Sequence, residues 1–278
     1  DADHYLSLHM ALEFIAMAVS VMIFALGWNV RDKPDSGQLP LMAGAFLAVA
    51  LIDLLHVLSY SGMPSLVTPS SPEKAINFWL AGRFIASCTL LFLALTRGYR
   101  WAEKYIGLGV WGGVICAIIV GYVGLFHADS LPSTFIPGEG LTPFKIGAEY
   151  VLVAMSWIAA GVFVRQASGE QTDIYAWLAV AAWTLGLSEL FFTLYQSVSD
   201  LMNMLGHVYK AIGYLMIYRA LYVAGVRIPY VRLAMTRQQL QATLEAVSDL
   251  VMEIDATGKI LACHTPATSV DGVNGHRL

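Results

Sequence analysis

The sequence predicts an all-α polytopic membrane protein, a bundle of seven transmembrane helices, and three observations support this prediction. Of its 278 residues, 57% are hydrophobic and only 13% are charged, whereas an average soluble domain carries about 25% charged residues. The mean hydropathy is +0.63. Apolar segments also reach the length of about 20 residues that crosses the hydrocarbon core. These segments are 8–30, 39–62, 75–97, 105–126, 144–167, 173–196 and 203–225.

The loops between the segments predict the orientation of the chain, because cytoplasmic loops carry an excess of Lys and Arg. The first, third and fifth loops, together with the segment after span seven, hold most of these residues: Arg31, Lys33, Arg97, Arg100, Lys104, Arg165, Arg227, Arg232 and Arg237. The second loop holds only Lys74, and the fourth and sixth hold none. We therefore expect the N-terminus outside and the C-terminus in the cytoplasm.

Composition excludes several other classes of protein. The formal net charge is −4, and no basic patch interrupts the apolar runs, so a nucleic-acid partner is not expected. Cys88, Cys116 and Cys263 lie far apart without a Cys-x-x-Cys spacing. This spacing argues against a disulfide framework or a zinc knuckle.

The composition changes after span seven. Leu233, Leu240 and Val247 are seven residues apart, with Leu244 between them. Such a heptad predicts a cytoplasmic helix over 226–248 that pairs with a partner, although an ordinary amphipathic linker helix remains an alternative. The segments VMEID and KILAC then flank Ala-Thr-Gly, which predicts a β-hairpin at the start of a soluble domain. The expected units are a sensor domain over 1–226, a signalling helix over 227–248 and the start of a further domain over 249–278.

Ionisable residues inside the spans are scarce and cluster at one depth. Given the predicted orientation and a rise of about 1.5 Å per residue, all of them fall in the outer half of the membrane. They are His9, Glu13, Asp53, His56, Arg83, Lys145, Glu149, Glu189, His207 and Lys210. Several are three or four residues apart and share a helix face. Because charges in a bilayer are expensive, we expect these side chains to converge on a common pocket.

The residue types allow several ligands. The candidate ligand-binding residues are Glu13, Asp53, His56, Arg83, Glu149, Glu189, His207 and Lys210. A metal site could use His9, His56 and His207, with Glu13 as an oxygen ligand or supporting partner. A b-type haem needs two facing histidines, and Arg83, Lys210 and His207 could bind a small polar or anionic molecule. No catalytic motif is present.

Purely structural roles remain open for some of these residues. Lys145 and Glu149 could form an ordinary ion pair, and Arg83 could neutralise Asp53 or Glu189. His127 is expected in solvent, in the fourth loop. Aromatic residues near span ends fit an interfacial belt that implies no cofactor; these are Trp79, Trp101, Trp111, Tyr105 and Tyr122.

Three other classes of membrane protein are alternatives to a sensor. A transporter could relay protons through its carboxylates, but its path should be polar on both sides of the midplane, and here the inner half is apolar. A redox protein could hold haem. A retinal protein would use Lys210, which lies too near the outer end for a chromophore in the middle of the membrane.

The segments that contain the charged residues also resemble those of a known protein family. The segments LHMALEF (8–14), DLLHVLSYSGMPSL (53–66), FWLAGRF (78–84), GEGLTPFKIGAEY (138–150), LSELFFTLYQSVSD (187–200) and LGHVYKAIGYLMIYRAL (205–221) resemble the membrane-associated sensor (MASE) domain family, third type. The resemblance covers 5–226, and DLVMEIDATGKI then resembles the start of an α/β PAS domain.

The resemblance implies a sensory input domain in a bacterial inner (cytoplasmic) membrane. In such proteins the output is a GGDEF diguanylate cyclase that makes c-di-GMP, often with an EAL phosphodiesterase, or a histidine kinase. Both outputs work as dimers, so a homodimer through the helix at 226–248 and the PAS domain is implied. The resemblance names no ligand, and the printed chain contains neither output motif.

Overall fold

The computed structural model describes residues 2–31, 39–65, 67–96, 106–167, 172–195, 200–246, 251–257 and 259–264. The chain divides into two compact units, Asp1–Gly225 and Val226–Leu278. Each unit has its own fold and is described by itself below.

Helices long and apolar enough to cross a membrane confirm all seven predicted spans. They are α1 (Ala2–Asn29), α2 (Leu39–Leu58), α3 (Pro72–Leu95), α4 (Ile106–Phe126), α5 (Pro143–Gln166), α6 (Thr172–Phe192) and α7 (Leu201–Tyr222). The predicted boundaries differ from the observed ones by a few residues, and local capping contacts account for part of this difference.

The start of α3 shows how capping moves a boundary. The side chain of Ser71 accepts a hydrogen bond from the Lys74 backbone N–H, and Pro72 occupies the first turn, where its missing N–H costs nothing. Lys74, which the sequence placed in a loop, therefore belongs to the helix. Its ammonium donates to the carbonyl oxygens of Thr68 and Pro69 and is thereby tied to the preceding loop.

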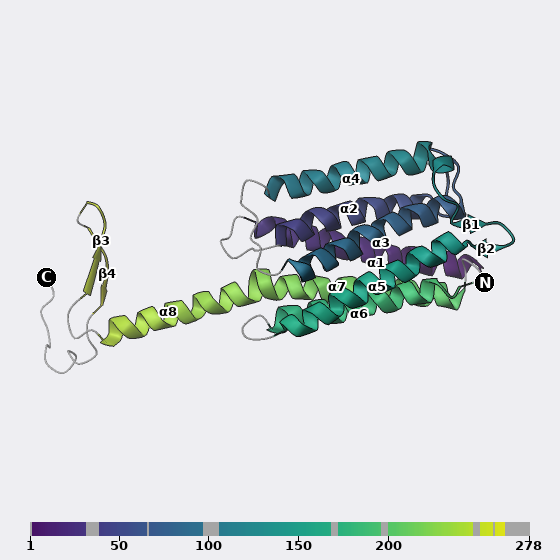
Figure 1. Ribbon diagram of the computed structural model, residues 1–278. Helices are drawn as coiled ribbons and strands as arrows, with labels where there is room; N and C mark the ends of the chain where they lie inside the picture. The colour runs from purple at the N-terminus through teal and green to yellow at the C-terminus, as the bar shows by residue number, and fades with distance from the viewer. Residues whose placement is uncertain are drawn as a thin grey trace, which may run out of the picture. The chain divides into compact units, whose positions relative to one another are not determined.

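Six of the seven helices form a closed ring, and the seventh packs outside it. The ring runs α1, α2, α3, α5, α6, α7 and back to α1, while α4 lies mainly against α2 (Figure 1). Glycines allow α4 to approach α2 closely, because a Cβ at Gly113 would overlap the carbonyl oxygen of Gly44, and one at Gly44 would overlap that of Gly109.

The fourth loop contains short structured elements where the sequence suggested only a loop. A 3₁₀ turn, η2 (Ala128–Ser130), precedes an antiparallel pair of strands, β1 (Phe135–Ile136) and β2 (Gly140–Leu141). This hairpin lies at the same end of the bundle as the start of α1 (Figure 1). We call this end the hairpin end.

The second unit begins with a helix and continues with a strand pair. A π-helical turn, η4 (Val223–Arg227), follows α7 directly and leads into α8 (Ile228–Ala246). Strands β3 (Val251–Ile254) and β4 (Ile260–His264) then pair in antiparallel fashion. A helix and an antiparallel strand pair therefore lie where the sequence predicts them, while the linker role of the helix and a PAS domain stay predictions.

Candidate functional site

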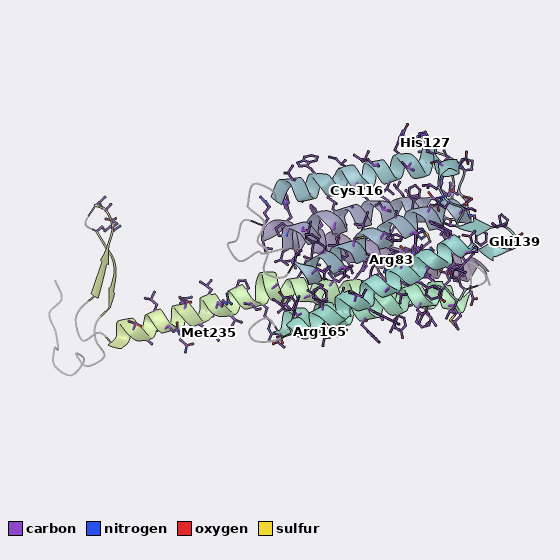
Figure 2. The ribbon with its side chains drawn as sticks, in the orientation of Figure 1. Arg83, Cys116, His127, Glu139, Arg165 and Met235 are labelled. Atoms are coloured by element: carbon purple, nitrogen blue, oxygen red, sulfur yellow. The ribbon has the colours of Figure 1, made fainter. Side chains whose placement is uncertain are left out.

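The ionisable residues predicted to converge do lie together, at the hairpin end of the ring. Each of the six ring helices contributes at least one of them, whereas the sequence of α4 has no charged residue. The set comprises His9, Glu13, Asp53, His56, Arg83, Lys145, Glu149, Glu189, His207 and Lys210, each at most 4% exposed. Figure 2 shows Arg83 inside the bundle, and His127 and Glu139 at the hairpin end.

Lys210 joins three helices through two carboxylates. Its ammonium Nζ lies 2.7 Å from Glu13 Oε2 on α1 and 3.0 Å from Asp53 Oδ2 on α2, while Lys210 itself is on α7. All three side chains are fully buried. Buried charges persist only when they are paired, so these contacts bind α1, α2 and α7 to each other. We call Lys210, Glu13 and Asp53 the Lys210 group.

Three histidine rings lie beside the Lys210 group. The ring centroids of His9 and His207 are 4.4 Å apart, those of His9 and His56 are 5.8 Å apart, and those of His56 and His207 are 6.5 Å apart. His9, His56 and His207 come from α1, α2 and α7, and we call them the histidine cluster. The helices that meet at Lys210 therefore also supply the three imidazoles.

Two of these rings have an oxygen atom close to Nδ1. His56 Nδ1 lies 2.7 Å from the carbonyl oxygen of Ala75, which can only accept, so Nδ1 carries the proton. His207 Nδ1 lies 2.6 Å from Glu13 Oε1. The Nε2 atom of His56 and both ring nitrogens of His9 are buried without a hydrogen-bond partner. The cluster therefore presents buried imidazole nitrogens that no group in the described part of the chain satisfies.

The structure identifies the carboxylate that pairs with Arg83, for which the sequence allowed either Asp53 or Glu189. Its Nε lies 2.7 Å from Glu189 Oε1, and its Nη1 donates to the Tyr214 hydroxyl at 2.8 Å. The ion pair is with Glu189, while Asp53 pairs with Lys210. Arg83 thus connects α3 to α6 and α7, and Tyr214 is a member of the site that charge alone did not identify.

Lys145 and Glu149 form a buried ion pair one helical turn apart on α5. The Lys145 ammonium also donates to the carbonyl oxygen of Phe192 at 2.7 Å and lies 4.6 Å from the ring centroid of Tyr195. A cation over an aromatic face is attracted by the ring quadrupole. The pair is therefore more than an interfacial i,i+4 contact, because it fixes the end of α6 against α5.

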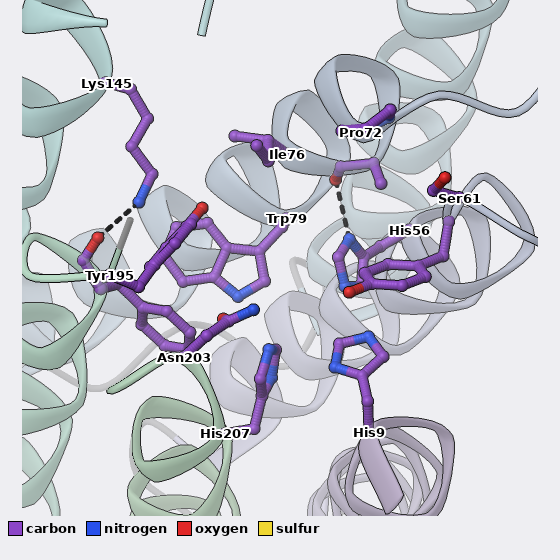
Figure 3. Close-up of a pocket in the computed structure, with 13 residues that line it drawn as sticks. His9, His56, Ser61, Pro72, Ile76, Trp79, Lys145, Tyr195, Asn203 and His207 are labelled. Carbon is purple, nitrogen blue, oxygen red and sulfur yellow. Dashed lines mark hydrogen bonds between the residues drawn. The ribbon is translucent and has the colours of Figure 1, made fainter. Parts of the chain in front are cut away.

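A small cavity lies among these groups (Figure 3). Its volume is about 30 Å³, and its walls include the histidine cluster, Tyr60, Trp79, Lys145, Phe192, Tyr195 and Asn203. Figure 3 shows the rings of His9, His56 and His207 on one side and the indole of Trp79 facing them. We call this cavity the histidine pocket.

Trp79 corrects an expectation from the sequence. It was assigned to an interfacial belt, but it is only 4% exposed, and its indole N–H is buried without a partner. Its position one turn before Arg83 placed it on the same helix face and was the available signal. Trp111 and Tyr122 are exposed on α4, as expected of residues that face lipid. Trp101 and Tyr105 lie outside the described residues.

The size of the histidine pocket restricts what it can hold as it stands. A cavity needs about 10–15 Å³ of space to hold one water molecule, so the histidine pocket has room for a very small ligand and is far too small for a haem macrocycle. Within the described part of the chain, no group of three His, Cys, Asp or Glu side chains is arranged to hold a metal ion.

Two tyrosines beyond the membrane-spanning segments border the pocket as neutral hydroxyls. Burial raises the pKa of Tyr60 to about 12, because the phenolate loses hydration. Burial likewise raises the pKa of Tyr195 well above its usual range. Both side chains therefore remain protonated at neutral pH and can donate hydrogen bonds.

The fold and the site define a polytopic membrane protein with an ionic network buried in its helical ring. The chain belongs to the MASE3 family of membrane-associated sensor domains, whose family model matches residues 1–229. No curated protein and no solved structure compared with the chain matches it.

Proposed function

We propose that this chain is the sensory input domain of a bacterial inner-membrane signalling protein. A small ligand binds in the histidine pocket, in the outer leaflet, and shifts the ring helices. Membership of a sensor-domain family supports the general role. The Lys and Arg residues of alternate loops support an external N-terminus and a cytoplasmic C-terminus.

One observation carries the proposed route of the signal. His207 lines the pocket and Lys210 binds α1 and α2, and both residues lie on α7. The π-helical turn η4 connects α7 to α8 without an intervening loop. A ligand that favours one arrangement of the ring over another shifts the population of the two states. The shift then passes along α7 to the linker helix.

We further propose that α8 pairs in a homodimer, leads into a PAS domain and regulates a cytoplasmic output. The favoured output is a diguanylate cyclase with a GGDEF domain, alone or with an EAL domain; a histidine kinase is the alternative. Exposed Leu233 and Leu240, seven residues apart on α8, support pairing of this helix.

The test compares variants of the full-length gene product in living cells. Combined His56→Ala and His207→Ala substitutions should change c-di-GMP levels, or autophosphorylation for a kinase, at equal membrane abundance. His127→Ala is the matched control, because this histidine is exposed in the fourth loop. If the double variant and the control both behave as wild type, the pocket is not the sensory site.

A further inference from the structure

We infer that the histidine pocket binds a small molecule with an HO–C=O group, which is either bicarbonate or a carboxylic acid the size of formic acid. This inference rests on the proposed function, because it names the chemical class of the ligand in that pocket. Three features carry it: an acceptor and a donor without partners, a cation in the pocket wall, and the volume of the cavity.

The acceptor is the Nε2 atom of His56. His56 Nδ1 donates to the carbonyl oxygen of Ala75, so Nε2 of the neutral ring can only accept. The side chain is 4% exposed, and Nε2 is buried without a hydrogen-bond partner in the described part of the chain. A ligand that satisfies this atom has to donate an N–H or an O–H.

The donor is the indole N–H of Trp79, which cannot accept. Trp79 lines the same pocket, and its Nε1 is buried without a partner among the described residues. Figure 3 shows this indole facing the rings of His56 and His207. Because a buried polar group without a partner costs free energy, a single ligand that both donates and accepts satisfies two such groups at once.

The wall of the pocket carries a positive charge. Among the described residues that line it, Lys145 is a cation and none is a carboxylate. An ammonium has three N–H groups; Lys145 donates one to the carbonyl oxygen of Phe192 and faces Glu149 with another. The remaining N–H can reach a ligand oxygen, so the wall favours negative charge on that oxygen. The four buried carboxylates of the ring each face a lysine or an arginine: Glu13, Asp53, Glu149 and Glu189.

The volume limits the ligand to a few atoms. The histidine pocket measures about 30 Å³, and one water molecule needs about 10–15 Å³ of such a cavity. The space therefore holds about two water-sized positions, which suits a molecule of three or four non-hydrogen atoms. Formic acid and bicarbonate have this size, whereas longer carboxylic acids exceed it.

An HO–C=O group meets all three requirements in one flat molecule. Its O–H donates to His56 Nε2, and its other oxygen accepts from the Trp79 N–H and the Lys145 ammonium. The proton can rest on the ligand oxygen or on Nε2, and both forms contain the same atoms and the same total charge. A ligand that only accepts leaves neutral His56 unsatisfied.

The two sources of this group differ in their proton. Bicarbonate carries its own O–H at neutral pH, whereas formate has to bind together with a proton. The charged and titratable groups around His56 affect both ligands alike, so a comparison of the two isolates the ligand's proton. These groups are His9 and Glu13 on α1, Asp53 and Tyr60 from α2 and its end, Lys145 on α5, Tyr195 after α6, and His207 and Lys210 on α7, while on α3 Lys74 is bound by the preceding loop and Arg83 by Glu189.

Binding is tested on the full-length protein, purified in detergent, by NMR titration with [¹³C]bicarbonate and [¹³C]formate. Both should bind, and the ratio of the formate to the bicarbonate dissociation constant should rise about tenfold between about pH 7 and pH 8, because formate takes up one more proton. Binding of one ligand alone identifies the source of the group and supports the inference. If neither binds, or if the ratio stays constant, the inference is overturned.

Two molecules of similar size serve as control ligands. Nitrate is a flat anion without an O–H, and formamide has a donor and an acceptor but no charge. Both should bind about tenfold or more weakly than bicarbonate, since each leaves one of the three requirements unmet. Nitrate or formamide binding as tightly as bicarbonate would overturn the assignment of the ligand class.

Substitutions that keep an aromatic ring locate the site. His56→Phe and Trp79→Phe should each weaken binding about 10–100-fold, because each removes one hydrogen bond to the ligand. Trp111→Phe and His127→Phe are the matched controls, since both side chains are exposed outside the pocket. Thermal unfolding and size exclusion identify variants that fold. Folded His56→Phe and Trp79→Phe variants with wild-type affinity would place the ligand elsewhere and overturn the inference.

The output of the full-length protein separates this inference from the proposed function. If neither bicarbonate nor formate binds but variants of His207 still change the output, the ligand class is wrong and the sensor proposal stands. If one of them binds in the histidine pocket and leaves the output unchanged, the ligand class is correct and the sensory role of the pocket is wrong.

Discussion

Lys210 Nζ lies 2.7 Å from Glu13 Oε2, although 197 residues separate the two side chains in the sequence. The same ammonium contacts Asp53, so one cation balances two carboxylates that are fully removed from solvent. The closure of the helical ring between α1 and α7 thus includes a charge contact at its hairpin end.

Replacing Lys210 by methionine should strongly destabilise the bundle. The substitution leaves Glu13 and Asp53 without their counter-ion, and removing one partner of a buried pair costs about 3–5 kcal/mol. The free energy of unfolding in mixed micelles measures the loss. Arg165→Met is the control, because Arg165 is exposed at the opposite end of the bundle (Figure 2). Equal stability of the two variants would contradict the pairing.

Tyr214→Phe should cost about 1–3 kcal/mol, because Arg83 Nη1 then loses its acceptor in a buried site. The same unfolding measurement applies. Tyr150→Phe is a matched substitution at a side chain that is 53% exposed, and it should leave stability unchanged. A Tyr214→Phe variant as stable as Tyr150→Phe would show that the hydroxyl contributes nothing to the network.

Alanine substitutions at two adjacent glycines of α4 should have different effects on the stability of the bundle. Gly113→Ala would push a methyl group into the Gly44 carbonyl and separate α4 from α2, whereas an added Cβ at Gly112 meets nothing within 4 Å. Gly112→Ala should be neutral, or stabilising by about 0.5–1 kcal/mol through helix propensity. Thermal unfolding of the two variants side by side checks this, and equal effects would contradict the close packing of α4 on α2.

Alkaline titration should show the raised pKa of Tyr60. Its pKa is raised to about 12 in the folded protein, so folding favours the protonated form. This contribution to stability is complete below pH 10, the ordinary value for tyrosine, and is lost as the pH rises through about 12. Phenolate absorbance should show one fewer late-titrating group in Tyr60→Phe than in wild type. Unfolded protein, in which every tyrosine titrates normally, is the control.

Charge placed on the heptad positions of α8 should break the proposed homodimer. Leu233 and Leu240 are 69% and 59% exposed, which is unfavourable unless a partner covers them. Leu233→Lys combined with Leu240→Lys should shift the chain to a monomer in light-scattering measurements. Gln238→Lys adds charge on the same helix away from these positions and should remain dimeric. A monomeric wild-type chain would exclude pairing through α8 alone.

The sequence was sufficient to predict the seven spans and the gathering of the charged residues in one region of the bundle. Apolar length defines a span, and the rise per residue places residues of different spans at similar heights. Their depth in a membrane stays a prediction. The i,i+3 and i,i+4 spacings also predicted shared helix faces, such as that of His207 and Lys210. The structure brings these residues together as expected, while their role in binding a ligand stays a prediction.

The ion-pair partner of each buried charged side chain could not be predicted, because it depends on the order of helices around the ring. Arg83 had two candidate carboxylates, and only the position of α3 opposite α6 and α7 selects Glu189. The same arrangement turns Trp79 inward, although its place near the end of a span resembles that of a lipid-facing aromatic residue. Ser71 similarly moves the start of α3 through a capping contact that periodicity does not detect.

The separation of Glu13 and Lys210 along the chain has a consequence for biogenesis. During synthesis the N-terminal segments emerge first, so α1 and α2 enter the bilayer with carboxylates whose counter-ion has not yet been made. An unpaired ionised carboxylate is costly there, and it must stay protonated or shielded until α7 arrives. Truncated chains that end before Lys210 keep these carboxylates unpaired permanently. Synthesis of α7 is therefore expected to complete the charge balance of α1 and α2, and truncated chains are expected substrates of membrane quality-control proteases.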